Sequence, residues 1–309
     1  MPLYTVFGLQ IDSELLVPWL LPGRNRAADV RIRLGSVPTA LPEPLGKGGY
    51  FEATRDTFLF RVTDLARFLV VKGQEITIDR VPDSSEHLLR TFLLGSAFGA
   101  LLHQRGLLVM HASSIQTARG AALFVGPSGQ GKSTLMAALV DRGYAMLADD
   151  VTAIEVDSPS GPQAFGSFPR MRLSAEAAAR LNYQIETLPR VPNSDKYLVP
   201  VDPFCGDALP VHAVFALNVH EASSITLAPV DAVDRFAIVG NNTYRYGFLE
   251  ALGLRQMHFQ AAAQLAKAVH VSRITRPASP FMLDELVDRL ELEFGGPVSA
   301  TQQIEQEVR

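Results

Sequence analysis

The stretch that decides the fold of this chain is Gly126-Pro127-Ser128-Gly129-Gln130-Gly131-Lys132-Ser133. It fits the pattern G-x-x-x-x-G-K-[ST] at every fixed position. A short apolar run, 121–125, precedes it, as expected of a buried strand, and the helix-favouring residues 135–140 follow it. A strand, a glycine-rich loop and a helix in this order predict an α/β domain whose loop binds phosphate.

The chemistry of this loop follows from its residue types. Its glycines can adopt conformations that turn consecutive backbone amides toward one point, and the helix N-terminus adds positive potential there. Lys132 would contribute a mobile positive charge for the β- and γ-phosphates, and the Ser133 hydroxyl would be a ligand of Mg²⁺. We therefore predict ATP and Mg²⁺ as cofactors. The predicted nucleotide-binding residues are Gly126, Pro127, Ser128, Gly129, Gln130, Gly131, Lys132, Ser133 and Thr134.

An acid pair, Asp149-Asp150, follows the next apolar run, 144–148, and Asp150 lies 18 residues after Lys132. This short spacing argues against transporter-type ATPases, in which the acid comes much later, after an LSGGQ-type signature that this chain lacks. A GTPase would need an N-K-x-D guanine motif, which is also missing. One carboxylate of the pair can orient the Mg²⁺ shell while the other accepts a proton from an attacking hydroxyl. The alternative is a solvated turn of two acids.

These features together resemble the HPr kinase/phosphorylase family. The resembling residues are Met110-His111-Ala112, the loop 126–133 and the stretch 142–150, with His111 lying 15 residues before Gly126. The resemblance implies an α/β fold with a P-loop kinase core of the HPr kinase C-terminal and PEP carboxykinase type, although the chain is too short for a PEP carboxykinase.

The resemblance also implies roles for individual residues. Lys132 and Ser133 would hold triphosphate and metal, Asp150 would accept the proton, His111 would lie near the phosphates, and Asp149 would be a supporting acid. The implied metal ligands are Ser133, Asp149 and Asp150.

Two departures from the family pattern limit what is carried over. Pro127 stands where the family has an acidic residue, and the family's later glycine-containing signature with its metal-binding glutamate is not recognisable, which puts phosphorylase activity in doubt. Glu176 lies nearby but is better interpreted as a residue in the first turn of a helix, on the surface.

The N-terminal part looks more like HPr-kinase-related proteins of lasso-peptide and other ribosomal peptide pathways. This second resemblance is carried by the opening residues Tyr4-Thr-Val-Phe-Gly-Leu-Gln-Ile-Asp-Ser-Glu-Leu.

The predicted function is therefore an ATP-dependent kinase that phosphorylates a serine-type hydroxyl of a peptide or small protein, such as a lasso or other ribosomal precursor peptide. Two alternatives stay open: a small-molecule kinase, and a nucleotide-gated regulatory or binding module with weak ATPase activity. The resemblance also allows a homo-oligomer.

Several other residues are candidates for the functional site, and most of them also have a structural or surface interpretation. Arg170, Arg172 and Lys196 could neutralise the transferring phosphoryl group or could be surface charges. The segment 241–246 could line the acceptor site or form a polar turn. Cys205 is interpreted as a structural thiol, because no histidine is near it in the sequence.

Composition excludes several classes of protein. The 309 residues carry 28 basic and 32 acidic side chains, a net charge of −4, which argues against a protein that coats nucleic acid or an anionic membrane. Hydrophobic residues reach 47%, as in a globular chain, and the single cysteine favours a reducing compartment. The first residues lack the pattern of a secretion signal, and no apolar stretch approaches the ~20 residues of a membrane span, so we expect a cytoplasmic protein.

The pattern along the chain predicts a division into parts. The early strands are expected at 4–11, 30–34, 58–62, 68–71 and 76–78, and later ones at 107–110, 121–125, 144–148, 211–218 and 269–274. Helices are expected from Asp83, capped by the Asp83/Glu86 spacing, to about Arg105, and then at 174–182, 248–268 and 281–293. The predicted parts are a β-rich N-terminal domain (1–82), a connecting buried helix (83–106), a P-loop kinase domain (107–295) and a polar tail (296–309).

Overall fold

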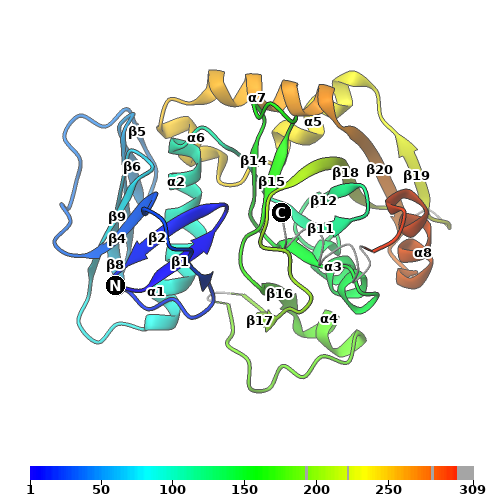
Figure 1. Cartoon of the computed structure of the whole chain (residues 1–309), viewed down its shortest axis with the longest axis horizontal. Coiled ribbons are helices and arrows are strands. Elements are labelled where there is room, and N and C mark those ends of the chain that lie inside the picture. The colour runs from blue at the N-terminus through cyan, green and yellow to red at the C-terminus, as the bar shows by residue number, and fades with distance from the viewer. Residues whose placement is uncertain (192–193, 221–222, 280–281, 298–309) are drawn as a thin grey trace.

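The computed structural model describes residues 1–191, 194–220, 223–279 and 282–297, and over these residues the protein is a mixed α/β structure with several sheets (Figure 1). An N-terminal sheet lies at one end, a helical segment lies beside it, and a second sheet with helices on both faces makes up the rest. No helix within the described ranges is both long and apolar enough to cross a membrane.

The N-terminal sheet has nine strands within the described residues, in the order β3-β1-β2-β4-β9-β8-β7-β6-β5. The expected single strand at 4–11 is wrong: Phe7 and Gly8 both have positive φ (52° and 72°), so the chain reverses there into a two-residue hairpin. The strands are β1 (Leu3–Val6), β2 (Leu9–Ser13), β3 (Leu21–Pro22), β4 (Val30–Leu34), β5 (Gly46–Lys47), β6 (Phe51–Ala53), β7 (Thr57–Val62), β8 (Ala66–Val71) and β9 (Glu75–Arg80).

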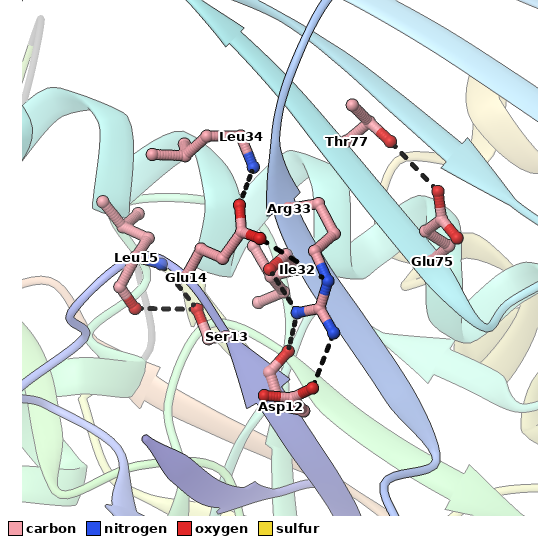
Figure 2. Close-up of polar contacts among 9 residues, drawn as sticks. All are labelled: Asp12, Ser13, Glu14, Leu15, Ile32, Arg33, Leu34, Glu75 and Thr77. Carbon is pink, nitrogen blue, oxygen red and sulfur yellow. Dashed lines mark hydrogen bonds and ion pairs between the residues drawn. The ribbon is translucent and has the colours of Figure 1, made fainter. Parts of the chain in front are cut away.

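An arginine fixes the parallel pairing of β2 with β4 (Figure 2). The Arg33 Nη2 atom is 2.6 Å from Asp12 Oδ2, and the Glu14 carboxylate accepts a hydrogen bond from the Leu34 amide at 2.8 Å. These contacts link the end of β2 to the end of β4 through partly exposed side chains. We assign them to the register of the strands, because parallel neighbours have no hairpin to set it.

A helical segment follows the N-terminal sheet and consists of α1 (Glu86–Phe92), the π-helical turn η1 (Leu93–Ala97) and α2 (Phe98–Gln104), of which η1 and most of α2 are buried. The expected cap at Asp83 is wrong. Ser85 is the N-cap, its hydroxyl accepting from the Leu88 amide, while Asp83 has φ +59° in the turn before it. One hydrophobic core joins this segment to the N-terminal sheet and also to residues of the second sheet, such as Val109.

The second sheet has the order β10-β14-β15-β18-β12-β11-β13, with β20 paired to β18 and β19 to β20. A separate two-stranded sheet pairs β16 with β17. The strands are β10 (Leu108–Met110), β11 (Ser113–Thr117), β12 (Gly120–Val125), β13 (Met146–Ala148), β14 (Thr152–Glu155), β15 (Gln163–Phe165), β16 (Arg170–Ser174), β17 (Lys196–Pro200), β18 (Leu209–His220), β19 (Thr226–Pro229) and β20 (His270–Pro277).

Helices cover both faces of the second sheet. One face packs against α3 and α8 and the other against α5 and α7, which run along the top of Figure 1. The expected helix 248–268 is two helices, since the chain breaks at Gly253 with φ +73°. The helices are α3 (Lys132–Asp141), α4 (Ala175–Arg180), α5 (Ala232–Asn241), α6 (Tyr246–Ala251), α7 (Arg255–Ala268) and α8 (Leu283–Phe294). Residue 281 of the expected last helix and residues 298–309 of the expected tail lie outside the described residues.

His103, on α2, makes the stability of the fold depend on pH. Its side chain is fully buried and its Nε2 lies 2.9 Å from the Tyr244 carbonyl oxygen. Burial lowers the pKa of His103 from 6.5 to about 4, so the unfolded chain binds a proton more readily between these values. The free energy of unfolding should therefore fall with falling pH in this window, by about 1.4 kcal/mol per pH unit from this group. Above pH 6.5 His103 is neutral in both the folded and the unfolded chain, so it no longer lowers the free energy of unfolding.

The variant His103→Gln tests this, because a glutamine amide can still donate to the Tyr244 carbonyl but does not titrate. Urea unfolding between pH 7 and 4.5 should give a shallower pH dependence for the variant than for the unchanged protein. Parallel pH dependences would refute the assignment.

Candidate active site

The sheet topology brings four strand ends to one edge. Both β12 and β13 are antiparallel to β11, which lies between them, so they are parallel to each other. Strands β18 and β20 are parallel to β12 as well. The glycine-rich loop after β12 and the acid pair after β13 therefore lie at the same edge of the sheet, although 18 residues separate Lys132 from Asp150.

A pocket of about 550 Å³ opens at this edge. Most of its lining was predicted from the sequence: the loop residues Ser128 to Thr134, the acids Asp149 and Asp150, and His111, Arg172 and Lys196. Residues not predicted also line it, among them Ser113, Val219 and Arg276.

The loop has the backbone conformations that its glycines were expected to supply. Gly126, Gly129 and Gly131 all have positive φ, between 85° and 138°. At Gly126 a Cβ atom would lie 2.6 Å from the Leu217 carbonyl oxygen, so no other residue fits there without displacing β18. The α3 helix begins at Lys132, so its N-terminus faces the loop.

Three contacts from distant segments hold the loop. The Asn242 Oδ1 atom accepts from the Gly126 amide at 3.0 Å, and Gln130 Oε1 accepts from the Val219 amide at 2.6 Å. Arg276 Nη2 donates to the Gln130 carbonyl at 3.0 Å. The loop is thus fixed in advance, so that binding a ligand would cost little ordering of the backbone.

Lys132 is buried at the base of the loop. Its Nζ donates to the carbonyl oxygens of Gly126 at 2.6 Å and Pro127 at 3.2 Å. Burial and then the positive charge of Lys196 lower the pKa of Lys132, while Asp149 and Asp150 act in the opposite direction. An ammonium surrounded in this way would be stabilised by an anion entering the pocket.

The two acids have different surroundings. Asp149 is buried, with one oxygen accepting from the Ser113 hydroxyl at 2.6 Å and the other from the Arg172 amide at 2.7 Å. Asp150 has φ +69°, a conformation that aspartate tolerates better than most residues, and its carboxylate is 16% exposed to the pocket. The structure therefore gives Asp149 a fixed position in the wall of the site and Asp150 a carboxylate that faces the pocket.

Arg172 and His111 hold Asp150 from two sides. Arg172 Nη1 is 2.6 Å from Asp150 Oδ2, and His111 Nδ1 is 3.0 Å from the Asp150 carbonyl oxygen and 3.5 Å from its Oδ1. Burial by itself opposes the charge of Arg172, but Asp150, then Tyr244 and Asp149, raise the pKa of Arg172 above its usual value. The guanidinium thus remains charged beside the Asp150 carboxylate that it contacts.

Of the remaining candidates from the sequence, some line the pocket and others do not. Lys196 lies in the pocket close enough to affect the pKa of Lys132, whereas Arg170 is not among the lining residues. Glu176 lies in the first turn of α4 and pairs with Arg180 at 2.8 Å, on the rim of the pocket. Burial raises the pKa of the Cys205 thiol to about 11, which suits the structural role expected of it.

The segment 241–246 runs from the last residue of α5, through a turn, to the first residue of α6, and it also lies against the site. Asn242 holds the Gly126 amide, its carbonyl accepts from the His111 amide at 2.7 Å, and the Tyr244 and His111 rings lie 6.3 Å apart. The contribution of Ser113 was not predicted, whereas Asn242 and Tyr244 belong to the segment for which the sequence left an acceptor site and a polar turn both open. No local pattern indicates the contacts of Ser113 and Asn242, because their partners, Asp149 and Gly126, lie 36 and 116 residues away in the chain.

Magnesium is compatible with the side chains present. The described part of the chain contains no group of three or more His, Cys, Asp or Glu that could enclose a metal. Mg²⁺ usually keeps several waters and binds through one or two protein oxygens plus substrate phosphates. Ser133, Asp149 and Asp150 line one pocket with the phosphate-type loop, so their oxygen chemistry fits such a site.

No family model matches the chain, and no curated protein matches it. The HPr(Ser) kinase/phosphatase from Coxiella burnetii is similar in structure, with 14% identical residues, coverage of 61% of this chain and 99% of that chain, and a TM-score of 0.30. The chain thus shows a weak structural similarity to a kinase/phosphatase.

Proposed function

We propose that this protein is a kinase that transfers the γ-phosphoryl group of ATP to a serine-type hydroxyl of a peptide or small protein. The observation that carries the proposal is that the Asp150 carboxylate faces the same pocket as Lys132 and the glycine-rich loop. A pocket built only to bind a nucleotide would not need a carboxylate held toward it by an arginine and a histidine.

Each residue has a task in this proposal. The amides of the loop residues 126–131 and the N-terminus of α3 bind the β-phosphate. The Lys132 ammonium leaves the loop carbonyls to bind the β- and γ-phosphates, and Ser133 with the acids provides oxygen ligands for the metal. Mg²⁺, when bound, would neutralise charge on the phosphates and hold them in line. Asp149 keeps Arg172 in place through its amide.

The transfer step uses Asp150 as the proton acceptor. The acceptor O–H bond breaks as its proton passes to the Asp150 carboxylate, and the oxygen forms a bond to the γ-phosphorus. The bond from the γ-phosphorus to the bridging oxygen breaks, which leaves ADP and the phosphorylated acceptor. His111, through its contacts with Asp150, keeps the carboxylate aimed at the acceptor.

The acceptor is proposed as a macromolecule, with lasso and other ribosomal precursor peptides as the first group to test. The N-terminal sheet offers a surface beside the kinase part that a metabolite kinase would not need. A nucleic acid or membrane partner does not fit a net charge of −4. We place the reaction in the cytoplasm, where ATP is available.

A direct test is incubation with ATP, Mg²⁺ and a panel of acceptors, with product masses recorded. The panel contains serine-bearing precursor peptides, HPr and small alcohols. We expect a gain of one phosphoryl mass on a serine peptide or on HPr. Transfer only to small alcohols would favour the metabolite kinase, and ATP hydrolysis with no acceptor phosphorylated would favour a nucleotide-gated module.

A further inference from the structure

Arg170 lies just outside the pocket and has no counter-charge in the described part of the chain. No ion pair or side-chain hydrogen bond of Arg170 is found among the residues that the structure describes, and it is half-buried at the start of β16. Its neighbour on the same face, Arg172, is by contrast paired with Asp150 at 2.6 Å. A half-buried guanidinium without a carboxylate is costly unless a ligand supplies the anion.

The register of the two-stranded sheet shows where Arg170 lies. Met171 and Leu173 point into the hydrophobic core, so Arg170, Arg172 and Ser174 share the opposite face. Ser174 is paired with Lys196, and both line the pocket together with the loop. Arg172, two residues back, holds Asp150.

Arg170 is the next position on this face, about 7 Å beyond Arg172 and farther from the loop. Phe168, two residues earlier, packs against the core of the N-terminal sheet. The face therefore runs from the loop side of the pocket, past Asp150, to the Arg170 guanidinium on the side that the N-terminal sheet borders.

From this order we infer that Arg170 binds an anionic group of the acceptor, and that the preferred acceptor is a peptide with a carboxylate or phosphate about two residues from its reactive serine. An extended peptide advances about 3.3 Å per residue, so an acid two residues away spans about the same length as the strand step from Arg172, the partner of Asp150, to Arg170. Burial without a neighbouring carboxylate lowers the pKa of Arg170, which agrees with a site prepared for an anion. The inference rests on the proposed kinase activity.

The test is phosphorylation of matched serine peptides that differ at one position. One set of peptides carries an Asp at each position from three residues before the serine to three residues after it. In the matched sets, Asn at the same position removes the charge, and phosphoserine at the same position replaces the carboxylate with a phosphate. We expect the acid two residues from the serine to raise kcat/KM about tenfold over its Asn match, through a lower KM.

Arg170→Gln should remove this preference, so that acidic and Asn peptides react alike, while the rate with the Asn peptide and the KM for ATP stay unchanged. Arg170→Lys should keep part of the preference. The matched control is Arg31→Gln, which removes an exposed strand arginine of the N-terminal sheet and should keep the preference whole.

The outcomes separate the inference from the proposed function. Transfer to Asn peptides with no advantage for acidic ones, or an equal loss for both peptides in Arg170→Gln, overturns the inference and leaves the kinase intact. No transfer to any peptide overturns the inference, and no transfer to either the peptides or HPr overturns both. A stronger effect of phosphoserine than of Asp would identify phosphate as the preferred anion.

Discussion

Replacing Lys132 by methionine is expected to lower phosphoryl transfer by a factor of about 10² to 10³. Lys132 is the buried cation at the base of the loop, and its ammonium now rests on the carbonyls of Gly126 and Pro127. A methionine of similar length fills the space but cannot stabilise the charge that develops on the γ-phosphoryl group. The effect is expected mainly in kcat, because in the proposed function the loop amides would still bind the nucleotide.

Transfer rates and ATP affinity of Lys132→Met would be measured side by side, with thermal unfolding to verify that the variant folds. Lys267→Met, at an exposed position near the end of α7, is the matched control and should behave like the unchanged protein. A variant with undiminished transfer would mean that the loop does not bind the reacting phosphates.

The second large effect is expected for Asp150→Asn, which should lower kcat by a factor of about 10² to 10⁴ with little change in the affinity for ATP. Asparagine has the same shape, tolerates the positive φ of 69° and can still accept a hydrogen bond from Arg172. It cannot accept the proton of the acceptor hydroxyl. The loss therefore reports proton transfer and not a change of fold.

The control is Asp157→Asn, which changes an exposed acid a few residues later in the chain and should leave transfer unchanged. Single-turnover measurements with a phosphorylatable peptide would separate chemistry from product release. Equal transfer by Asp150→Asn and the unchanged protein would remove Asp150 from the reaction. Equal ATP hydrolysis in both, with no acceptor modified, would point to the nucleotide-gated module.

The sequence predicted local elements well wherever one pattern was sufficient. Strand β12, helix α3 and the loop between them lie where the glycines and apolar runs indicated. These three features depend mainly on residues that are neighbours in the chain. It failed where short-range signals competed. The hairpin turn at Phe7 and the break at Gly253 interrupt patterns that read as continuous, and Ser85 caps the helix in place of Asp83.

The sequence by itself determined the phosphate-type loop, the acid pair and the histidine before them, because spacing along the chain carries that information. Only the tertiary structure decided that the acids differ, with Asp149 held by Ser113 and Arg172 and Asp150 facing the pocket. The reason is that hydrogen bonds and burial depend on which strands are neighbours. Strand β11, inserted between β12 and β13, sets that arrangement, and no local pattern along the chain encodes it.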